Sequence, residues 1–464
     1  MTTVLALSTL ALLSWLVPAH WRVLAWLVIS MGALYALQDV VQPAGPDFAT
    51  LTLIVIFGVW WLVRRASPLN EKDEKLSRED RIAIGAAIGM MLAAGLLRGA
   101  VLTLTLGVGL VALSGSMFNI LLPTADDHDG RRRLALLWIV ALIGALGVLK
   151  TPALSDQLRL TLSAPNWNFP SLSWFGFSYI AFRLLHVLID YRNGRLPALS
   201  LRDFALYAVF FPTLSAGPID RVQHFASMLT TAADKHFELR YVWAGGQRIL
   251  WGLFRKFVLA DSLANLALSP RLIQAAPLHP LGTWLMLYAY AFYIFLDFSG
   301  YTDIAIGIGL LIGITLPENF RRPYSRRNIA LFWNSWHITL SNWYREYVFI
   351  PASRALLKAR WHPLLAAFAV QLGTMILIGL WHGVSWNFIA WGAWHGVGLY
   401  AHRQLVTRAA SIAPAPPGSP RAYAAQAGSV IVTFHFVALG WVFFALPDLH
   451  SSLKVFAALF GIAR

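Results

Sequence analysis

Apolar stretches long enough to cross a lipid bilayer follow one another along almost the whole chain, and this pattern constrains the fold most strongly. The 464 residues are 58% hydrophobic and only 13% charged, whereas soluble domains carry about a quarter charged residues. A bilayer core about 30 Å thick needs about 20 apolar residues per helix, which gives roughly eleven to twelve candidate spans here. The sequence therefore predicts an all-α polytopic membrane protein without a sizeable soluble domain.

Basic residues in the short loops predict the orientation of the chain. The segment 64–75, RRASPLNEKDEK, follows the third candidate span, and Arg131 to Arg133 come two spans later. Short loops rich in Lys and Arg mark the cytoplasmic side, so counting back three crossings places the N-terminus outside the cytoplasm. The first apolar segment has no preceding Lys or Arg and no clear cleavage site, and we expect it to be retained.

The net charge of +15 and the absence of cysteine limit the possible functions. Most of the positive charge serves topology, although a basic inner face also attracts an acidic partner such as a carrier protein. No basic folded module lies outside the membrane, so nucleic acid is not an expected partner. Without cysteine the chain has no disulfide, no thiolate metal site and no cysteinyl acyl-enzyme, and we expect no bound metal or cofactor.

Motifs are distributed unevenly along the chain. Residues 1–150 are apolar and nearly free of histidine, which is typical of a transmembrane scaffold. Residues 151–410 hold almost every polar motif, and residues 411–464 contain the last hydrophobic segments after the Pro-rich stretch APAPPGSP. We find no internal repeat, which disfavours a transporter built from inverted repeats.

His337 lies in FWNSWHITLSNWYREYVFIP, residues 332–351. This segment is too polar for a lipid-facing span and too aromatic for a solvated loop. Polar backbone at membrane depth is tolerated only against protein or a water-filled cavity. We therefore predict an amphipathic or re-entrant helix there.

The uncharged run from residue 364 to 402 would be about 57 Å long as one helix, nearly twice the bilayer core. We predict a break at WHGVSW, where Gly383 caps one helix and Ser385 begins the next. His382 then lies at a helix end and faces a cavity. His395 would point about 220° away if both shared one helix, so the two histidines need not share a site.

Each candidate residue also has a purely structural interpretation. A histidine inside a membrane segment can simply join two helices by a hydrogen bond, and for His395 we favour that interpretation. Asp297 and Asp303 can cap a turn as readily as contact substrate. The four arginines of RRPYSRR can anchor topology or bind a phosphate. They are Arg321, Arg322, Arg326 and Arg327.

A neutral imidazole near a hydroxyl can act as a general base while the oxygen attacks an activated acyl carbon, and a thioester is such an acyl donor. The histidines and the basic inner face together favour acyl transfer from a cytoplasmic thioester. A proton-coupled transporter or flippase that uses His382 as a proton relay is the alternative from another class.

Several ordered motifs resemble the membrane-bound O-acyltransferase family, in its bacterial branch with alginate O-acetylation and teichoic-acid D-alanyl transfer proteins. The motifs are FFPTLSAGPIDR, GLFRKFVLAD, LDFSGYTDIAIGIGLLIG, LPENF and the two histidine stretches, all within residues 165–400, with a weaker match in FHFVALGWVFFALPDL. The residues after FIP are closer to the D-alanyl branch, whereas GWVFF favours the acetylation branch.

The resemblance implies two catalytic histidines, His382 in WHG and His337 in WHITL. It also implies a tunnel from a cytoplasmic thioester, acetyl-CoA or an acyl-phosphopantetheine, to an extracytoplasmic acceptor, and an accessory protein that completes the transfer. Other residues expected along this tunnel are Trp333, Asn334, Trp336, Trp381, Asp297 and His395. The expected protein is an acetyltransferase of the bacterial cytoplasmic membrane that modifies an envelope polysaccharide, with D-alanyl transfer to teichoic acid as the alternative.

Overall fold

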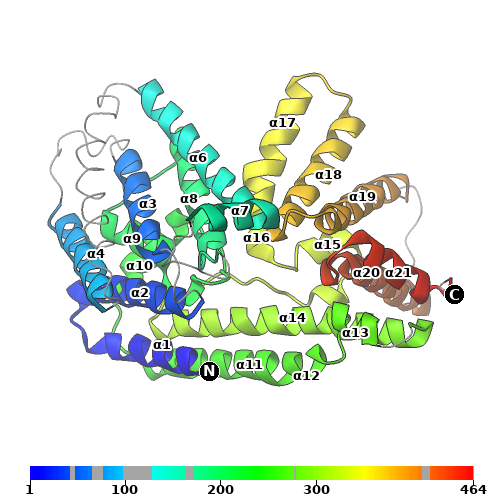
Figure 1. The fold of residues 1–464 in the computed structure, drawn as a ribbon, viewed down its shortest axis with the longest axis horizontal. Helices are drawn as coiled ribbons and strands as arrows, with labels where there is room; N and C mark the ends of the chain where they lie inside the picture. Colours follow the sequence, from blue (N-terminus) through cyan, green and yellow to red (C-terminus); the bar gives the residue numbers. More distant parts are fainter. Residues whose placement is uncertain are drawn as a thin grey trace. The chain divides into compact units, whose positions relative to one another are not determined.

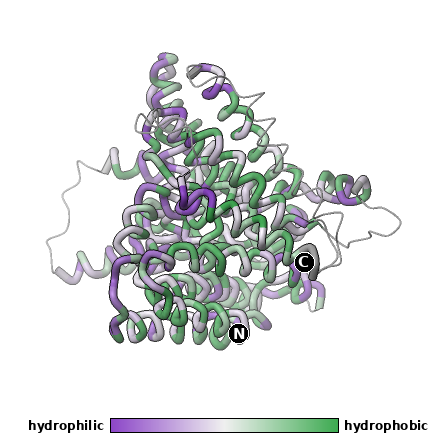
Figure 2. The backbone as a smooth tube through the Cα atoms, turned by 90° about the vertical axis from the view of Figure 1, so that its left-hand side faces the viewer, coloured by the Kyte–Doolittle hydropathy of each residue, from purple (hydrophilic) through white to green (hydrophobic). Residues whose placement is uncertain are grey.

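The computed structural model describes residues 1–41, 47–64, 77–97, 128–162, 172–275, 278–409 and 419–462. All regular structure in these ranges is helical, with no strand, which confirms the predicted all-α membrane class (Figure 1). Hydrophobic residues dominate most of the helices (Figure 2). Most of the predicted loop at 64–75 and the Pro-rich stretch at 413–420 lie outside the described residues.

Five described helices are long and apolar enough to cross a membrane. They are Ala19–Val41, Asp129–Lys150, Pro280–Leu311, Pro363–His382 and Pro420–Ala445, and shorter apolar helices cover Thr2–Leu16, Phe48–Val63 and Leu449–Leu459. The predicted number of roughly eleven to twelve spans stays a prediction, because apolar residues such as those at 98–127 lie outside the described ranges. The predicted three-part division of the chain also stays a prediction.

The chain forms two compact units. The first contains residues Met1–Ile249 and Ile304–Pro317, and the second contains Leu250–Asp303 and Glu318–Arg464. Two helices, α11 (Leu239–Leu253) and α14 (Pro280–Leu311), contribute residues to both units.

The first unit's other helices, besides α11 and α14, are α1 (Thr2–Leu13), α2 (Ala19–Val41), α3 (Phe48–Val63), α4 (Arg78–Leu97), α6 (His128–Lys150), α7 (Pro152–Leu162), α8 (Phe177–Arg192), α9 (Leu201–Val209) and α10 (Val222–Ala233). Helices α2, α3, α4 and α10 pack against α9, and α3 and α6 pack against α8. The guanidinium of Arg183 on α8 is buried and donates hydrogen bonds to the carbonyl oxygens of Tyr207, Ala208 and Thr213. It thereby satisfies backbone acceptors that the end of a helix leaves unpaired.

The second unit contains the histidine motifs. Its remaining helices are α12 (Asp261–Ala264), α13 (Pro270–Ala275), α15 (Ile329–Trp333), α16 (Ile338–Tyr344), α17 (Ile350–Lys358), α18 (Pro363–His382), α19 (Trp386–Ala409), α20 (Pro420–Ala445) and α21 (Leu449–Leu459). A π-helical turn, Phe254–Ala260, follows α11, and a second, Arg345–Phe349, joins α16 to α17.

The predicted break at WHGVSW is confirmed. Helix α18 ends at His382, and the N–H of its C-cap Gly383 donates to the carbonyl oxygen of Gly379 at 3.3 Å. The Ser385 hydroxyl accepts a hydrogen bond from the Phe388 N–H at 3.4 Å, which begins α19. The two helices pack so closely at Gly379 that a Cβ there would lie 2.1 Å from the Phe388 carbonyl oxygen. Small residues permit this close approach between membrane helices.

The segment 332–351 differs from the single helix that its sequence predicts. Helix α15 ends at Trp333, and α16 begins only after His337. The interruption occurs because His337 adopts the left-handed conformation, with φ 41° and ψ 55°, which cannot continue a right-handed helix.

Candidate functional site

The backbone at His337 is held in its left-handed conformation by Asn319 of the LPENF motif. The Ile338 N–H donates to the Asn319 carbonyl oxygen at 3.0 Å. The Asn319 Oδ1 accepts hydrogen bonds from the Thr339 N–H at 3.3 Å and from the Thr339 hydroxyl at 2.6 Å. A non-glycine residue with positive φ costs about 1–3 kcal/mol and persists only where its surroundings fix it, most often at functional sites.

The imidazole of His337 is buried and unsatisfied. Its exposed fraction is 3%, and neither ring nitrogen has a hydrogen-bond partner within the described ranges. The ring instead lies edge-on to Phe298 at 4.7 Å and to Trp381 at 6.2 Å between centroids. Burial disfavours the charged form of an imidazole, so the neutral ring has one nitrogen that can donate and one that can accept a hydrogen bond.

His382 ends α18 and is surrounded by aromatic rings. Its ring centroid lies 4.6 Å from that of Trp381, 4.8 Å from Phe444 and 5.7 Å from Trp391. Phe388 stacks on the ring at 6.0 Å. Unlike His337, this histidine is only partly buried.

Trp381 joins the two histidines, because its ring contacts both imidazoles. The separation of the two imidazole centroids therefore cannot exceed the sum of 6.2 and 4.6 Å. This is well below about 20 Å, two thirds of a bilayer core, beyond which a shared passage would be excluded. The structure thus brings together the two histidines that the sequence selects.

His395 lies nearer to His382 than its spacing suggests. Both rings contact Trp391, at 5.7 Å for His382 and 5.0 Å for His395. His395 is fully buried beside Trp333, and neither of its nitrogens has a partner among the described residues. The favoured interpretation as a helix-joining hydrogen bonder is therefore wrong for the described part of the chain.

The other residues expected along the passage divide into two groups. Trp333 and Trp381 contact the histidines, whereas Trp336 is buried against Phe332 and Trp441. Asn334 is exposed and accepts a hydrogen bond from Arg345, so the structure does not bring it to the histidines.

Asp297 and Asp303 do not cap a turn, because both lie inside the continuous helix α14. Asp297 pairs with Lys256 and Asp303 with Arg255, both from the first π-helical turn. Gly300 lies between the two aspartates in the sequence, and a Cβ there would lie 2.9 Å from the backbone nitrogen of Lys256, so glycine permits the close approach of the π-helical turn. The two cations are thus engaged with carboxylates of α14.

The arginine run 321–327 lies close to His337 in the fold. The Arg321 N–H donates to the Ser335 carbonyl oxygen at 3.0 Å, two residues before His337. Tyr324 inserts its ring against Phe332 and Trp336. Arg321, Arg322 and Arg327 are exposed, and none of the four guanidinium groups forms an ion pair with another described residue. The Arg326 guanidinium donates to the Arg321 carbonyl oxygen. Guanidinium groups without an ion pair are suited to bidentate phosphate binding.

Sequence reasoning missed several residues that complete the aromatic surroundings of the histidines. Phe298 follows Asp297 in the LDFSG motif, and Phe444 belongs to GWVFF, but the motifs alone do not indicate that these rings contact the histidines. The LPENF motif likewise does not indicate the role of Asn319. No local signal marks Phe388, since its contact with His382 depends on how α18 and α19 pack.

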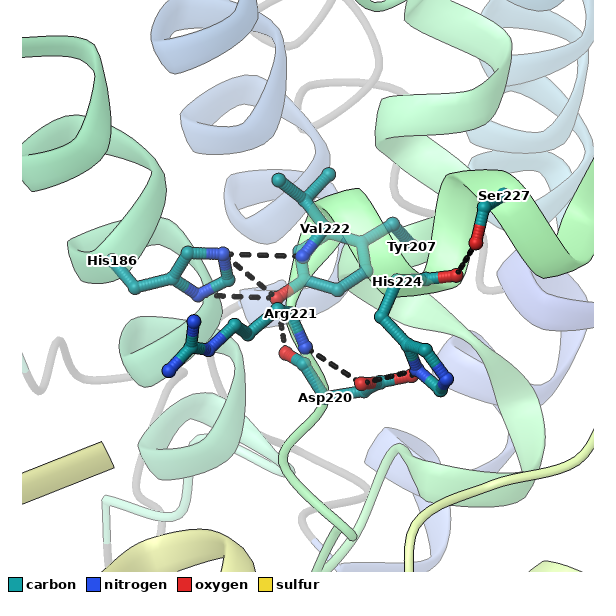
Figure 3. A network of polar contacts seen from close by, with 7 residues as sticks. All are labelled: His186, Tyr207, Asp220, Arg221, Val222, His224 and Ser227. Carbon is teal, nitrogen blue, oxygen red and sulfur yellow. Dashed lines mark hydrogen bonds and ion pairs between the residues drawn. The ribbon is translucent and has the colours of Figure 1, made fainter. Parts of the chain in front are cut away.

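A second polar network lies in the first unit, around the motif FPTLSAGPIDR (Figure 3). The Tyr207 hydroxyl donates to the Asp220 carbonyl oxygen at 2.8 Å, and the Val222 N–H donates to His186 Nε2 at 3.2 Å. The Asp220 carboxylate accepts a hydrogen bond from the half-exposed His224 ring at 2.8 Å. That hydrogen bond raises the pKa of His224 above its usual range.

These features define a polytopic α-helical membrane protein with buried histidines in an aromatic cluster. Residues 172–445, more than half of the chain, match the model of the membrane-bound O-acyltransferase family. The chain belongs to this family.

Curated relatives fall into both branches that the motifs resemble. The chain is 37% identical over 263 residues to the peptidoglycan O-acetyltransferase of Helicobacter pylori, covering 56% of this chain and 47% of that protein. It is 35% identical over 290 residues to the probable alginate O-acetylase AlgI of Azotobacter vinelandii, covering 62% of this chain and 53% of that protein. It is 31% identical over 299 residues to the teichoic acid D-alanyltransferase of Streptococcus thermophilus, covering 61% of this chain and 71% of that protein. The chain thus spans about half the length of the first two relatives.

Proposed function

We propose that this chain is an O-acyltransferase of the bacterial cytoplasmic membrane that passes an acetyl group from a cytoplasmic thioester to an envelope polysaccharide outside. The observation that carries the proposal is that the rings of His337 and His382 both contact Trp381. Family membership supports the reaction class. The N-terminus lies outside the cytoplasm in this proposal, because the basic loops then face inward.

In the proposed reaction His382 acts as the general base. Its imidazole takes the proton of the acceptor hydroxyl while the oxygen attacks the thioester carbonyl carbon. The tetrahedral intermediate then collapses, the carbon–sulfur bond breaks, and the leaving thiolate takes the proton from the imidazolium. One thioester and one alcohol thus give one ester and one thiol. The partial exposure of His382 suits a residue that meets an incoming acceptor.

His337 holds the donor in this scheme. Its neutral ring, buried and without a partner among the described residues, can donate a hydrogen bond to the thioester carbonyl oxygen as negative charge develops there. The aromatic rings around it exclude water and so limit thioester hydrolysis. The nearby arginine run then binds the phosphate of coenzyme A or of a carrier-bound phosphopantetheine.

Acetyl is the proposed acyl group because the described rings that contact the two histidines are uncharged. A D-alanyl group carries an ammonium, for which a carboxylate is the usual partner, and Asp297 and Asp303 already hold Lys256 and Arg255. D-alanyl transfer is the second candidate. It is supported by the Streptococcus relative, of which the alignment covers 71%, and by the net charge of +15, which suits an acidic carrier protein. An accessory extracytoplasmic protein completes the transfer in either case.

Alkali-labile esters of the cell envelope provide the test. Cells lacking the gene would be complemented with the wild-type protein, with His337→Gln, or with no protein, and mild alkali would release acetate and D-alanine for quantification. We expect wild-type protein to restore acetate alone and His337→Gln to restore less than a tenth of it. Restoration of D-alanine without acetate would replace the acetyl proposal by its alternative, and restoration of neither would contradict both.

A further inference from the structure

A cavity of about 300 Å³ with charged side chains in its lining lies in the first unit where three helices begin. Its lining residues come from the first two turns of α2 and α4 and from the first turn of α9. They are His20, Trp21, Leu24, Arg78, Glu79, Ile82 and Arg202. The N-terminal ends of helices carry partial positive charge, so the convergence of three favours an anionic group in the cavity.

The charged side chains around this cavity are arranged unequally. Arg78 is exposed and forms no ion pair with another described residue. Arg202 is held by Glu79 at 3.2 Å and by Asp203 at 2.9 Å, so its guanidinium is fixed in place. The cavity therefore offers one free cation, among the described residues, beside an Arg–Glu pair. A ligand with both a negative and a positive group matches this arrangement.

The same two helices line an apolar cavity further along. It measures about 40 Å³, and α2 contributes Leu27 and Met31 while α4 contributes Ile84, Ala87 and Ile88. No charged residue lines it. Along α2 and α4 the lining thus changes from charged to fully apolar within one or two helical turns, which is the polarity profile of an amphiphile at a membrane surface.

We infer that α2, α4 and α9 bind one phospholipid of the inner leaflet whose headgroup carries a phosphate and a primary ammonium, as phosphatidylethanolamine does. The phosphate pairs with Arg78, the ammonium pairs with Glu79, whose side chain is 52% exposed beside Arg202, and an acyl chain runs along α2 and α4 past the small apolar cavity. Trp21, which is 39% exposed beside the headgroup, takes the interfacial position that tryptophan favours. This site does not depend on the acyl-transfer chemistry.

Photo-crosslinking of the full-length protein tests the lipid site. The protein would be reconstituted in phosphatidylcholine vesicles with a small fraction of phosphatidylethanolamine or phosphatidylglycerol that carries a diazirine in its acyl chain, and labelled peptides would be mapped by mass spectrometry. We expect phosphatidylethanolamine to label α2 and α4 around Met31 and Ala87. Arg78→Glu should lower this labelling about tenfold, because losing one charge-assisted hydrogen bond lowers the affinity for the lipid by about that factor. Arg133→Glu, an exposed residue on α6 outside the cavity, should leave it unchanged.

Three further outcomes distinguish the ligand. Glu79→Gln should abolish the preference for phosphatidylethanolamine over phosphatidylglycerol, because it removes the partner of the ammonium. Excess inorganic phosphate should not reduce labelling, since it lacks the ammonium and the acyl chains that also hold the lipid. Complete loss of labelling in excess phosphate would show that the phosphate contact alone sets binding, and would overturn the assignment of a lipid with an ammonium headgroup. Equal labelling of wild type and Arg78→Glu would overturn the site itself.

Discussion

His337 is the most constrained single residue of the candidate site, because its backbone is left-handed and its buried ring has no partner within the described ranges. The sequence identified the residue from its aromatic and polar neighbours. It could not identify the backbone conformation, since only glycine signals positive φ reliably and the anchor is Asn319, eighteen positions earlier. Residue type was therefore predictable and residue geometry was not.

Asn319→Ala should impair both stability and activity. The Thr339 N–H and hydroxyl would lose their acceptor in a buried position, at a cost of about 1–3 kcal/mol, and the His337 turn would lose its anchor. Asn328→Ala is the matched control, because Asn328 only caps the short helix α15 and is not beside a histidine. The unfolding temperature and the rate of acyl transfer should both fall in Asn319→Ala. Equal acyl-transfer activity in the two variants would contradict the anchoring role.

His224 should give a small pH dependence of stability. Its hydrogen bond to Asp220 raises the pKa in the folded protein, so the stabilisation is fully present below the unfolded pKa of about 6.5 and is lost as the pH rises through the folded value. The pair is half-exposed, so its contribution is only about 0.2–1 kcal/mol. His224→Gln should lower the unfolding temperature more at pH 5.5 than at pH 8.5. A larger effect at pH 8.5 would show that the pKa of His224 is not raised in the folded protein.

Helices α18 and α19 show which parts of an element the sequence can predict. The break between them follows from the length of the apolar run, so it was predictable from a bilayer dimension. Their close packing was not, because it depends on which glycines face the partner helix. Gly379 meets the Phe388 carbonyl oxygen, whereas Gly373 on the same helix has open space where a Cβ would lie.

This difference gives a paired prediction. Gly379→Ala should force α18 and α19 apart, displace His382 and lower both thermal stability and acyl transfer. Gly373→Ala should be neutral or stabilise the protein by up to about 1 kcal/mol, because alanine favours a helix and meets no atom within 4 Å. Equal effects of the two substitutions on the unfolding temperature would contradict the packing described here.

The arginine run can be tested as one segment. A topology anchor needs only positive charge, whereas bidentate phosphate binding needs guanidinium. Replacing Arg321, Arg322, Arg326 and Arg327 by lysine should therefore raise the apparent KM for a coenzyme A thioester several-fold and have less effect with a thioester that lacks phosphate. An unchanged KM for both donors would leave the run as an anchor.

For the whole molecule, composition alone predicted the all-α membrane class, because few charges and long apolar runs admit little else. It could not predict that α14 contributes to both compact units, or that its two aspartates pair with neighbouring cations of one π-helical turn. Those pairings depend on contacts between residues more than forty positions apart. The O-acyltransferase class followed from the ordered motifs, and the fold brings their histidines together.

Acetyl transfer across a sealed bilayer tests the central claim most directly. Purified protein would be reconstituted in vesicles with a radiolabelled acetyl thioester outside, and β-1,4-linked N-acetylglucosamine oligosaccharides and the accessory protein sealed inside. Wild-type protein inserted with its cytoplasmic side outward should release thiol outside and form labelled ester inside. His382→Gln nearly preserves the side-chain volume. It should reduce thiol release and labelled ester formation by at least about a hundredfold, the usual contribution of a general base. Labelled ester formed equally by the two proteins would contradict the account.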